Sequence, residues 1–284
     1  MRLAVAARWY WVVQGNLSEG RRFFDGILER TVGAPKELRA RALVHAAIFP
    51  FRLGENRLAA DLLQESLDLY RELGDEEGIA RSTAELGGIA IAEGDLDRGA
   101  KLYEETLPLL RKQGNLARVA VALGNLGTIA HMRGEYPTAV GYYRESIGAS
   151  RSAGDEDGVG VNLHNLARSE LALGRVDAGL AALRESLGIA RRLNYRELIA
   201  YLLGGFAELA MIEDDPTRAA TLLGASDHLF AEIGAIPSPD EAQVQERVAA
   251  YVVAALGEER VAELRAAGAA STLDDLLEDV ASRA

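Results

Sequence analysis

The 284-residue sequence contains no cysteine. This absence excludes a disulfide framework, a thiolate-bound zinc ion and a cysteine nucleophile, and it is typical of proteins in the reducing cytoplasm. No apolar run approaches the roughly 18 residues of a membrane-spanning helix. The opening segment, residues 1–13, is too short for a secretory signal peptide and carries no cleavage site. We therefore expect a cytoplasmic protein without a membrane segment.

Positive charge is scarce, with 31 Lys and Arg residues against 43 Asp and Glu residues and a formal net charge of −12. Such an excess of negative charge argues against direct binding to nucleic acid. Half of it lies in residues 240–284, which hold ten acidic residues and four arginines. The sequence also has no G-x-x-x-x-G-K-[ST] loop for a nucleotide phosphate and no nucleophile elbow. It predicts a non-catalytic protein without a cofactor.

Glycine, by contrast, recurs at a fixed spacing. One series, continued by Asp214, has a period of 40 residues give or take one and comprises Gly15, Gly54, Gly94, Gly134 and Gly174. A second series, half a period out of phase, comprises Gly74, Gly114, Gly154, Asn194 and Gly234. A period of about 20–50 residues is typical of stacked-repeat proteins. The two series divide each period into halves that are each long enough for one helix, so the sequence predicts helix–turn–helix units.

Other positions recur in the same register. A small residue, such as Gly99 or Ala139, follows each turn glycine by five, and a large apolar residue, such as Tyr103 or Leu183, follows four later. Glycine within a helix costs about 1 kcal/mol relative to alanine, so its recurrence indicates close approach of two helices. A hydroxyl recurs three residues beyond the large one, and we expect it to bond to a carbonyl one turn back in its own helix. The hydroxyl positions are Ser66, Thr106, Ser146, Ser186 and Ser226.

This pattern, with Leu86-Gly87 and Leu126-Gly127 ahead of the turn glycine, resembles the tetratricopeptide repeat over residues 1–234. The period is 40 rather than 34, and the closing proline is absent. Arg8 stands where the family has a small residue, which leaves open whether the first repeat is complete. The resemblance implies an all-α, right-handed α-solenoid of about six helical hairpins, followed by a helical cap over residues 235–284. The expected cap helices are about 240–256, 258–267 and 273–282.

Residues 219–281 resemble the end of the repeat region in bacterial regulators of the LuxR and AfsR type, and residues 1–30 resemble its beginning. In those regulators a signal-transduction ATPase module precedes the repeats and a DNA-binding domain lies at one end. The resemblance implies the sensor or scaffold region of a transcriptional regulator, with the ATPase and DNA-binding domains of the same parent protein as partners. The alternative is a free-standing receptor for a small ligand or a signalling peptide.

In repeats of this family the first helix of each unit lines the concave face. The inward positions of these helices predict a groove for a protein or peptide partner, because amides can bond to a peptide backbone and arginines can bind its carboxylates. The predicted ligand-binding residues are Arg41, Arg81, Asn125, Thr128, His164, Asn165 and Arg168. The alternative is ordinary solvated side chains on a helix face. The lysine that chaperone-binding relatives need is absent, since Val44, Ala84 and Gly124 occupy that position in three of the repeats.

Two further features are interpreted as structural. His131 and His164 are offset by seven positions, or about 10 Å along the helix axes plus about 10 Å between helices. A nitrogen of His131 and a nitrogen of His164 cannot then both lie within about 2 Å of one metal ion, so we predict no metal site.

Trp11 occupies a core position of the family and is expected to be buried. Trp9 and Tyr10 either cover the open end of the first repeat or dock a preceding domain.

Overall fold

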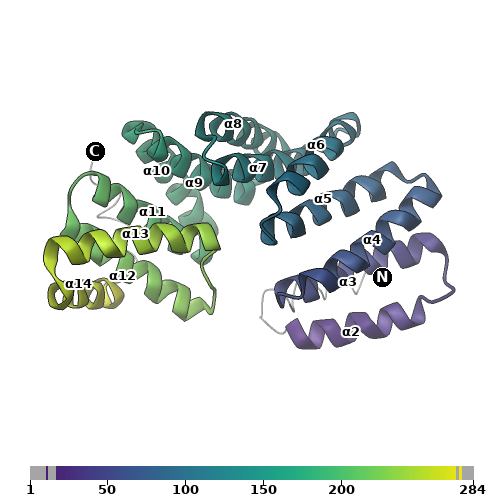
Figure 1. Ribbon diagram of the computed structural model, residues 1–284, viewed down its shortest axis with the longest axis horizontal. Coiled ribbons are helices and arrows are strands. Elements are labelled where there is room, and N and C mark those ends of the chain that lie inside the picture. The colour runs from purple at the N-terminus through teal and green to yellow at the C-terminus, as the bar shows by residue number, and fades with distance from the viewer. Residues whose placement is uncertain (1–10, 12–16, 273–274, 277–284) are drawn as a thin grey trace. The chain divides into compact units, whose positions relative to one another are not determined.

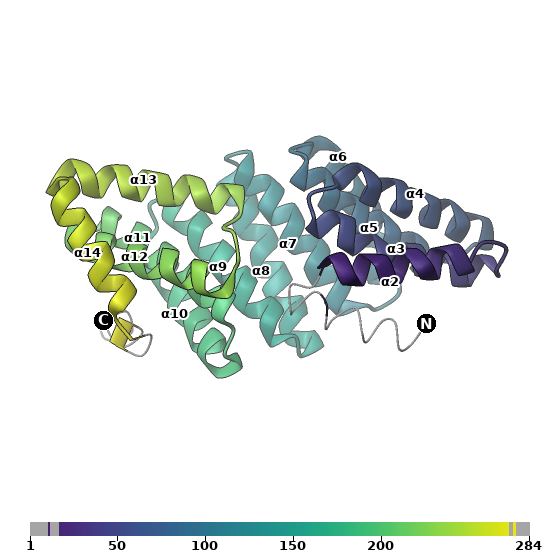
Figure 2. The same cartoon turned by 90° about the horizontal axis from the view of Figure 1, so that it is seen from below.

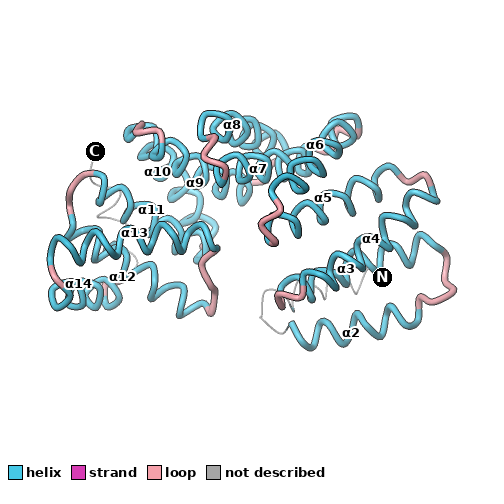
Figure 3. The backbone as a smooth tube through the Cα atoms, viewed as in Figure 1, coloured by secondary structure: helices cyan, strands magenta, loops and turns pink. Residues whose placement is uncertain are grey.

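The computed structural model describes residue 11, residues 17–272 and residues 275–276, except for the side chains of residues 239–240. Within these residues every regular element is a helix (Figures 1 and 3). The chain divides into two compact units, one ending at Ile129 and one beginning at Ala130. The first holds α2 (Leu17–Arg30), α3 (Lys36–Arg52), α4 (Asn56–Leu73), α5 (Glu76–Ala92), α6 (Leu96–Lys112) and nearly all of α7 (Leu116–Met132). The second holds α8 (Tyr136–Ala153), α9 (Glu156–Ala172), α10 (Val176–Leu193), α11 (Arg196–Ile212), α12 (Pro216–Ile233), α13 (Pro239–Leu256) and α14 (Glu258–Ala270).

The helix boundaries confirm the predicted repeat. Helices α3, α5, α7, α9 and α11 begin at residues 36, 76, 116, 156 and 196, so each starts 40 residues after the last. The turn glycines from Gly54 onward lie between helices with positive φ, for example 78° at Gly94 and 75° at Gly134, while Gly15 lies outside the described residues. Asn194 and Asp214 continue the two series with φ of 50° and 59°. The turns need a left-handed residue, and glycine adopts that conformation without a Cβ clash.

Aspartate after the turn glycine caps the next helix, as the sequence suggests. The Asp75 carboxylate accepts hydrogen bonds from the backbone N–H groups of Glu77 and Gly78, at 3.1 and 3.0 Å. Asp155 accepts a bond of 3.0 Å from the N–H of Gly158 at the start of α9. These bonds satisfy donors that an α-helix leaves without an intrahelical partner.

The recurring hydroxyls differ in part from the prediction. Thr106 does bond to the carbonyl of Leu102 in its own helix, at 2.6 Å. Two of the serines instead donate to the first helix of their hairpin: Ser66 to Ala40 O at 2.9 Å and Ser186 to Gly160 O at 2.7 Å. A small, fully buried side chain at the helix crossing brings its hydroxyl within reach of the neighbouring backbone. Ser66 and Ser186 therefore link two helices, whereas Thr106 links two turns of one helix.

Each unit has its own apolar core. In the first, Phe24 and Phe49 are buried with ring centroids 5.2 Å apart. Trp11 is half-buried and packs edge-on against Phe49, with ring centroids 6.5 Å apart. The expected burial of Trp11 is thus only partial, while Arg8, Trp9 and Tyr10 lie outside the described residues. In the second unit, α13 contributes Val248 to the core.

The C-terminal helices pack closely on the last repeat. Helix α14 follows α13 through a single residue, Gly257, whose φ of 80° and ψ of 157° are accessible essentially to glycine alone (Figure 2). Gly268 of α14 lies against the backbone of Thr221 in α12, and Gly224 of α12 lies against the backbone of Arg265. These reciprocal glycines let the two helices touch. Most of the third expected cap helix, 273–282, lies outside the described residues.

Candidate functional site

In the first unit, four of the predicted ligand-binding residues lie on first helices. Arg41 pairs with Glu37 at 3.8 Å, and Arg81 pairs with Glu77 at 3.1 Å. Asn125 and Thr128 are half-buried on α7, where Thr128 donates to the carbonyl of Gly124 at 3.2 Å. Both arginine pairs are local i,i+4 pairs on a partly exposed face, and pairs of this kind contribute little to stability. Ligand binding by Arg41, Arg81, Asn125 and Thr128 stays a prediction.

Arg81 acts on its neighbourhood in the first unit. Burial lowers the pKa of the Arg118 guanidinium on α7, and the positive charge of Arg81 lowers that pKa further. Burial also raises the pKa of the Tyr70 phenol, an effect that Arg81 and Arg41 oppose. The side chains of Arg41, Arg81 and Arg118 on first helices α3, α5 and α7 therefore lie near one another, together with acidic groups such as Glu77 and Glu85.

In the second unit, His164, Asn165 and Arg168 lie on α9, but only Asn165 is partly exposed. His164 is 4% exposed and Arg168 is 8% exposed. Arg168 Nε lies 4.0 Å from Glu241 Oε2 of α13, and Glu241 itself is 1% exposed. Helix α13 therefore covers the part of the α9 face that the sequence predicted to meet a ligand. Binding by His164 and Arg168 stays a prediction, and a ligand has to reach them beside α13.

Helix α13 runs alongside α11, where the first helix of a further repeat would lie (Figure 1). Its contacts keep one register along α11: Ser238 N donates to Tyr201 Oη at 3.2 Å, and Tyr251 Oη donates to Asp214 Oδ1 at 2.8 Å. Between these two contacts, Arg247 Nη2 donates to Glu208 Oε1 at 2.5 Å. Burial raises the pKa of the Glu208 carboxyl even though Arg247 and Arg168 lower it.

The end of α9 breaks the apolar pattern of the repeat. Ser169 and Glu170 are 0% and 1% exposed. The equivalent positions one period before and after are apolar: Ile129 and Leu209 for Ser169, and Ala130 and Ala210 for Glu170. Burying a carboxylate is costly, and positions that break the rules of their own fold are expected to be functional or strained. Sequence reasoning missed this cluster, although the change at 169–170 was visible in the aligned repeats.

Each polar residue of this cluster has partners in the second unit. Ser169 Oγ lies 2.8 Å from His131 Nδ1 and donates to the carbonyl of Asn165 at 3.2 Å. Glu170 accepts from Arg144 at 2.7 Å and from Arg175 at 3.1 Å. The serine thereby fixes the orientation of the imidazole.

Beside the cluster, α13 forms one wall of a cleft of about 640 Å³. Its lining residues come from the end of α7, the start of α8, α9 and α13: His131, Met132, Tyr136, Arg168, Gln243, Val244, Glu246, Arg247 and Ala250. A narrower space of about 290 Å³ adjoins it and shares five of these residues. The narrower space reaches Leu171 and Ala172 of α9 and Glu208, Met211 and Ile212 of α11.

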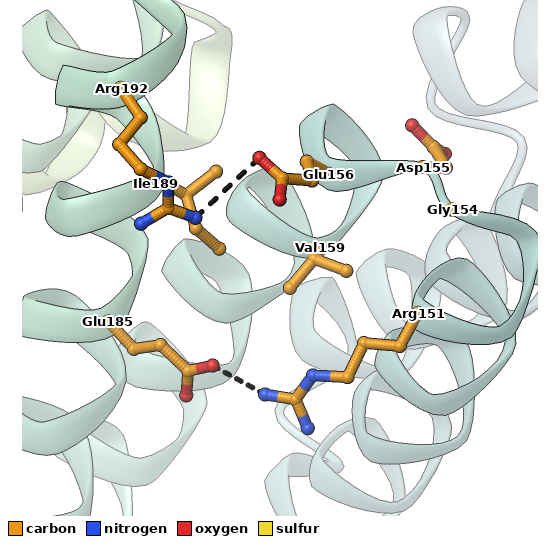
Figure 4. A pocket seen from close by; sticks show the side chains of 8 residues that line it. All are labelled: Arg151, Gly154, Asp155, Glu156, Val159, Glu185, Ile189 and Arg192. Carbon is orange, nitrogen blue, oxygen red and sulfur yellow. Dashed lines mark hydrogen bonds and ion pairs between the residues drawn. The ribbon is translucent and has the colours of Figure 1, made fainter.

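A second hollow of about 390 Å³ lies where α8, α9 and α10 meet (Figure 4). Four of its five charged side chains are paired with one another: Arg151 with Glu185 at 2.5 Å and Arg192 with Glu156 at 3.6 Å (Figure 4). Similar cross-helix pairs recur elsewhere, such as Lys36 with Glu72. We interpret this hollow as part of the packing between repeats.

Two kinds of feature are absent from the described residues. They contain no group of three or more His, Asp or Glu side chains placed to hold a metal ion. Among these residues, too, no helix combines the length and the apolar character that crossing a membrane requires.

Comparison with known proteins agrees with the fold. Residues 78–152 match the tetratricopeptide repeat family model, whereas comparison with curated proteins gave no match. Among solved structures, a Rap protein complexed with competence and sporulation factor has a TM-score of 0.72 at 14% identity, over 94% of this chain and 75% of that one. BtubC from P. vanneervenii has a TM-score of 0.62 at 19% identity, over 80% and 94%.

A signal-transduction ATPase with a tetratricopeptide repeat sensor, from Pyrococcus horikoshii, has a TM-score of 0.61 at 15% identity. The match covers 93% of this chain and 44% of that protein. At such identities the likeness concerns the fold. The chain is an all-α array of helical hairpins with the architecture of tetratricopeptide repeat proteins.

Proposed function

We propose that this chain is a non-catalytic module that binds a protein or peptide along the first helices of its repeats. The observation that carries the proposal is the contrast between the two helix types. Second helices pair their charges with other helices, as Arg151 of α8 does with Glu185 of α10 (Figure 4). First helices also carry paired charges, such as Arg41 with Glu37, but beside them they present amides and exposed apolar side chains, among them Asn125 and Val121, which is 56% exposed. Such a mixture suits an extended peptide.

We further propose that the module is the sensor or scaffold region of a bacterial transcriptional regulator with an ATPase module. Two observations support this. Residues 219–281 resemble the end of the repeat region in such regulators, and the fold is similar to that of an ATPase with a tetratricopeptide repeat sensor. In that arrangement the ATPase and DNA-binding domains of the parent protein are the intramolecular partners, and the repeats act in the cytoplasm.

A free-standing peptide receptor is the second candidate. The similarity to a Rap protein complexed with competence and sporulation factor favours it, because that protein has a similar fold and is in complex with a factor. The coding sequence of the full parent gene separates the two candidates. A phosphate-binding loop encoded in the same reading frame supports the regulator, and its absence from the complete gene supports the receptor.

The binding function is tested by capture and titration. The chain serves as bait in a lysate of the source organism, captured partners are identified by mass spectrometry, and fluorescent peptides from them are titrated. Asn165→Ala is the test variant, because the side chain is half-buried on α9. Lys101→Ala on α6, where the side chain is 77% exposed, is the control. We expect a several-fold loss of affinity only for Asn165→Ala, and equal affinities would contradict binding through first helices.

A further inference from the structure

Methionine side chains line both adjoining spaces beside α13. Met132 lies on the cleft and Met211 on the narrower space next to it, although 79 positions separate the two residues in the sequence. Met132 and Ile212 are 42% and 41% exposed, so this apolar surface is open to solvent. Methionine is flexible and polarisable, and it is common where a binding surface adapts to different apolar groups. The lining therefore suits an apolar side chain of a ligand.

The charges of the cleft differ from those of its surroundings. Residues 130–284 contain 14 Arg and 25 Asp and Glu residues, which gives −11. The cleft is nonetheless lined by two arginines, Arg168 and Arg247, against one acid, Glu246, and the narrower space adds one further acid, Glu208. Arg247 is 61% exposed and gives one N–H to Glu208, while a guanidinium carries five N–H donors. Arg247 can therefore bind a carboxylate and keep its contact with Glu208.

The polar cluster of α9 holds one wall of the cleft in place. At position 131 a histidine replaces the apolar residues found one period before and after, Ile91 and Leu171. Ser169 fixes the His131 ring through the 2.8 Å contact, and Tyr136 contacts the ring edge-on with centroids 5.2 Å apart. The imidazole of His131 and the phenol of Tyr136 are therefore held in one orientation next to the flexible methionines, so the polar part of the lining is ordered before a ligand binds.

We propose that this cleft binds an apolar peptide side chain together with a neighbouring carboxylate of the same peptide. The apolar side chain lies against Met132, Met211 and Ile212, and the carboxylate bonds to the guanidinium of Arg247. The inference rests on the proposed peptide-binding function and names the ligand feature that this part of the chain selects.

The two methionines make the site directly observable. The chain is labelled with ¹³C at the methionine methyl groups, and the methyl signals are followed by nuclear magnetic resonance during titration with N-acetyl-leucine, which has both features. N-acetyl-leucinamide lacks the carboxylate and acetate lacks the apolar side chain. We expect saturable shifts of the Met132 and Met211 signals with N-acetyl-leucine and about tenfold weaker binding of the other two probes, because a charge-assisted hydrogen bond or a buried aliphatic side chain is worth at least that factor.

Two charge variants complete the test. Arg247→Gln keeps an N–H donor for Glu208 but removes the positive charge, and we expect it to bind N-acetyl-leucine about tenfold more weakly. Arg192→Gln removes the same charge from α10, in the hollow of Figure 4, and should bind as the wild type does. Absent methyl shifts, equal affinity for the amide, or unchanged binding by Arg247→Gln would each overturn the inference. If Arg247→Gln binds captured partner peptides with the affinity of the wild type, this inference is wrong while the proposed function stands. If the chain captures no protein or peptide at all, the proposed binding function is itself contradicted.

Discussion

Gly87 on α5 allows a sharp test of how the hairpins are packed. A Cβ added at Gly87 would lie 2.8, 2.9 and 3.1 Å from three ring atoms of Tyr103, which is 2% exposed. Ordinary carbon contacts are about 3.5–4.0 Å, so the ring would have to move. Overpacking of this kind costs about 1–3 kcal/mol, whereas alanine gains about 1 kcal/mol over glycine in a helix. We expect Gly87→Ala to lower the free energy of unfolding by about 1 kcal/mol.

The adjacent residue is a matched control. A Cβ at Gly88 would lie 3.5 Å from the Tyr103 hydroxyl oxygen, which is an ordinary contact. Gly88→Ala should therefore raise the free energy of unfolding by about 0.5–1 kcal/mol through helix propensity alone. Urea denaturation followed by circular dichroism measures both changes. A Gly87→Ala variant that matches Gly88→Ala in stability would refute the proposed close contact.

The repeats themselves supply a compensating change. The position equivalent to Gly87 in each first helix holds glycine or alanine. Where it holds glycine, the position equivalent to Tyr103 in the second helix holds tyrosine, and where it holds alanine, that position holds leucine. The pairs are Ala47–Leu63, Gly87–Tyr103, Gly127–Tyr143, Ala167–Leu183 and Ala207–Leu223. The double variant Gly87→Ala, Tyr103→Leu reproduces a natural pair. We expect a favourable coupling of about 0.5–3 kcal/mol between the two changes in a double-mutant cycle. Additive effects would mean that the two positions do not share a packing constraint.

Further predictions concern α13 and the helix caps. Arg168→Ala removes the cation paired with the buried Glu241 carboxylate and should lower the free energy of unfolding by about 3–5 kcal/mol. The double variant Arg168→Ala, Glu241→Gln should recover much of this loss, because no charge is then left buried without its partner; urea denaturation measures both. Burial raises the pKa of Glu208 in the folded protein above its ordinary 4.5, so ionisation of this carboxyl opposes folding. The free energy of unfolding of the wild type should therefore fall relative to that of Glu208→Gln as the pH rises from 4.5 through the folded-state pKa. A difference that is constant with pH, measured by thermal melts, would contradict this. Asp75→Ala removes the cap of α5 and should lower the free energy of unfolding by about 0.5–2 kcal/mol. Glu104→Ala is the control, because Glu104 is exposed within α6 and caps no helix, and it should leave the free energy of unfolding unchanged.

The helix boundaries could be predicted from the sequence because their determinants are local. A glycine that adopts positive φ ends one helix, and the next aspartate caps the following one, so Gly94 and Asp95 fix a turn by themselves. The position of α13 could not be predicted in this way. It depends on contacts such as Glu241 with Arg168, 73 positions apart, which no periodicity records. For the same reason Arg168 was placed on an open groove, whereas the structure buries it beneath α13.

The buried polar residues of α9 show a related limit. The sequence contains the departure from the repeat pattern at Ser169 and Glu170, but it does not show that His131, Arg144 and Arg175 supply their partners. Those partners come from neighbouring turns and helices, so packing decides whether a polar residue faces solvent or a buried contact. The sequence alone therefore does not show which polar positions of a first helix stay accessible to a ligand.

The most direct test of the central claim is site-specific photo-crosslinking to a captured partner peptide. A photoreactive amino acid is placed at Val161 on first helix α9, which is 36% exposed, and in a separate variant at Arg192 on second helix α10. Mass spectrometry then measures the yield of crosslinked peptide from each variant. Binding along the first helices predicts a strong crosslink from position 161 and little from position 192. A crosslink confined to position 192 would show that the partner binds the second helices and would contradict the account.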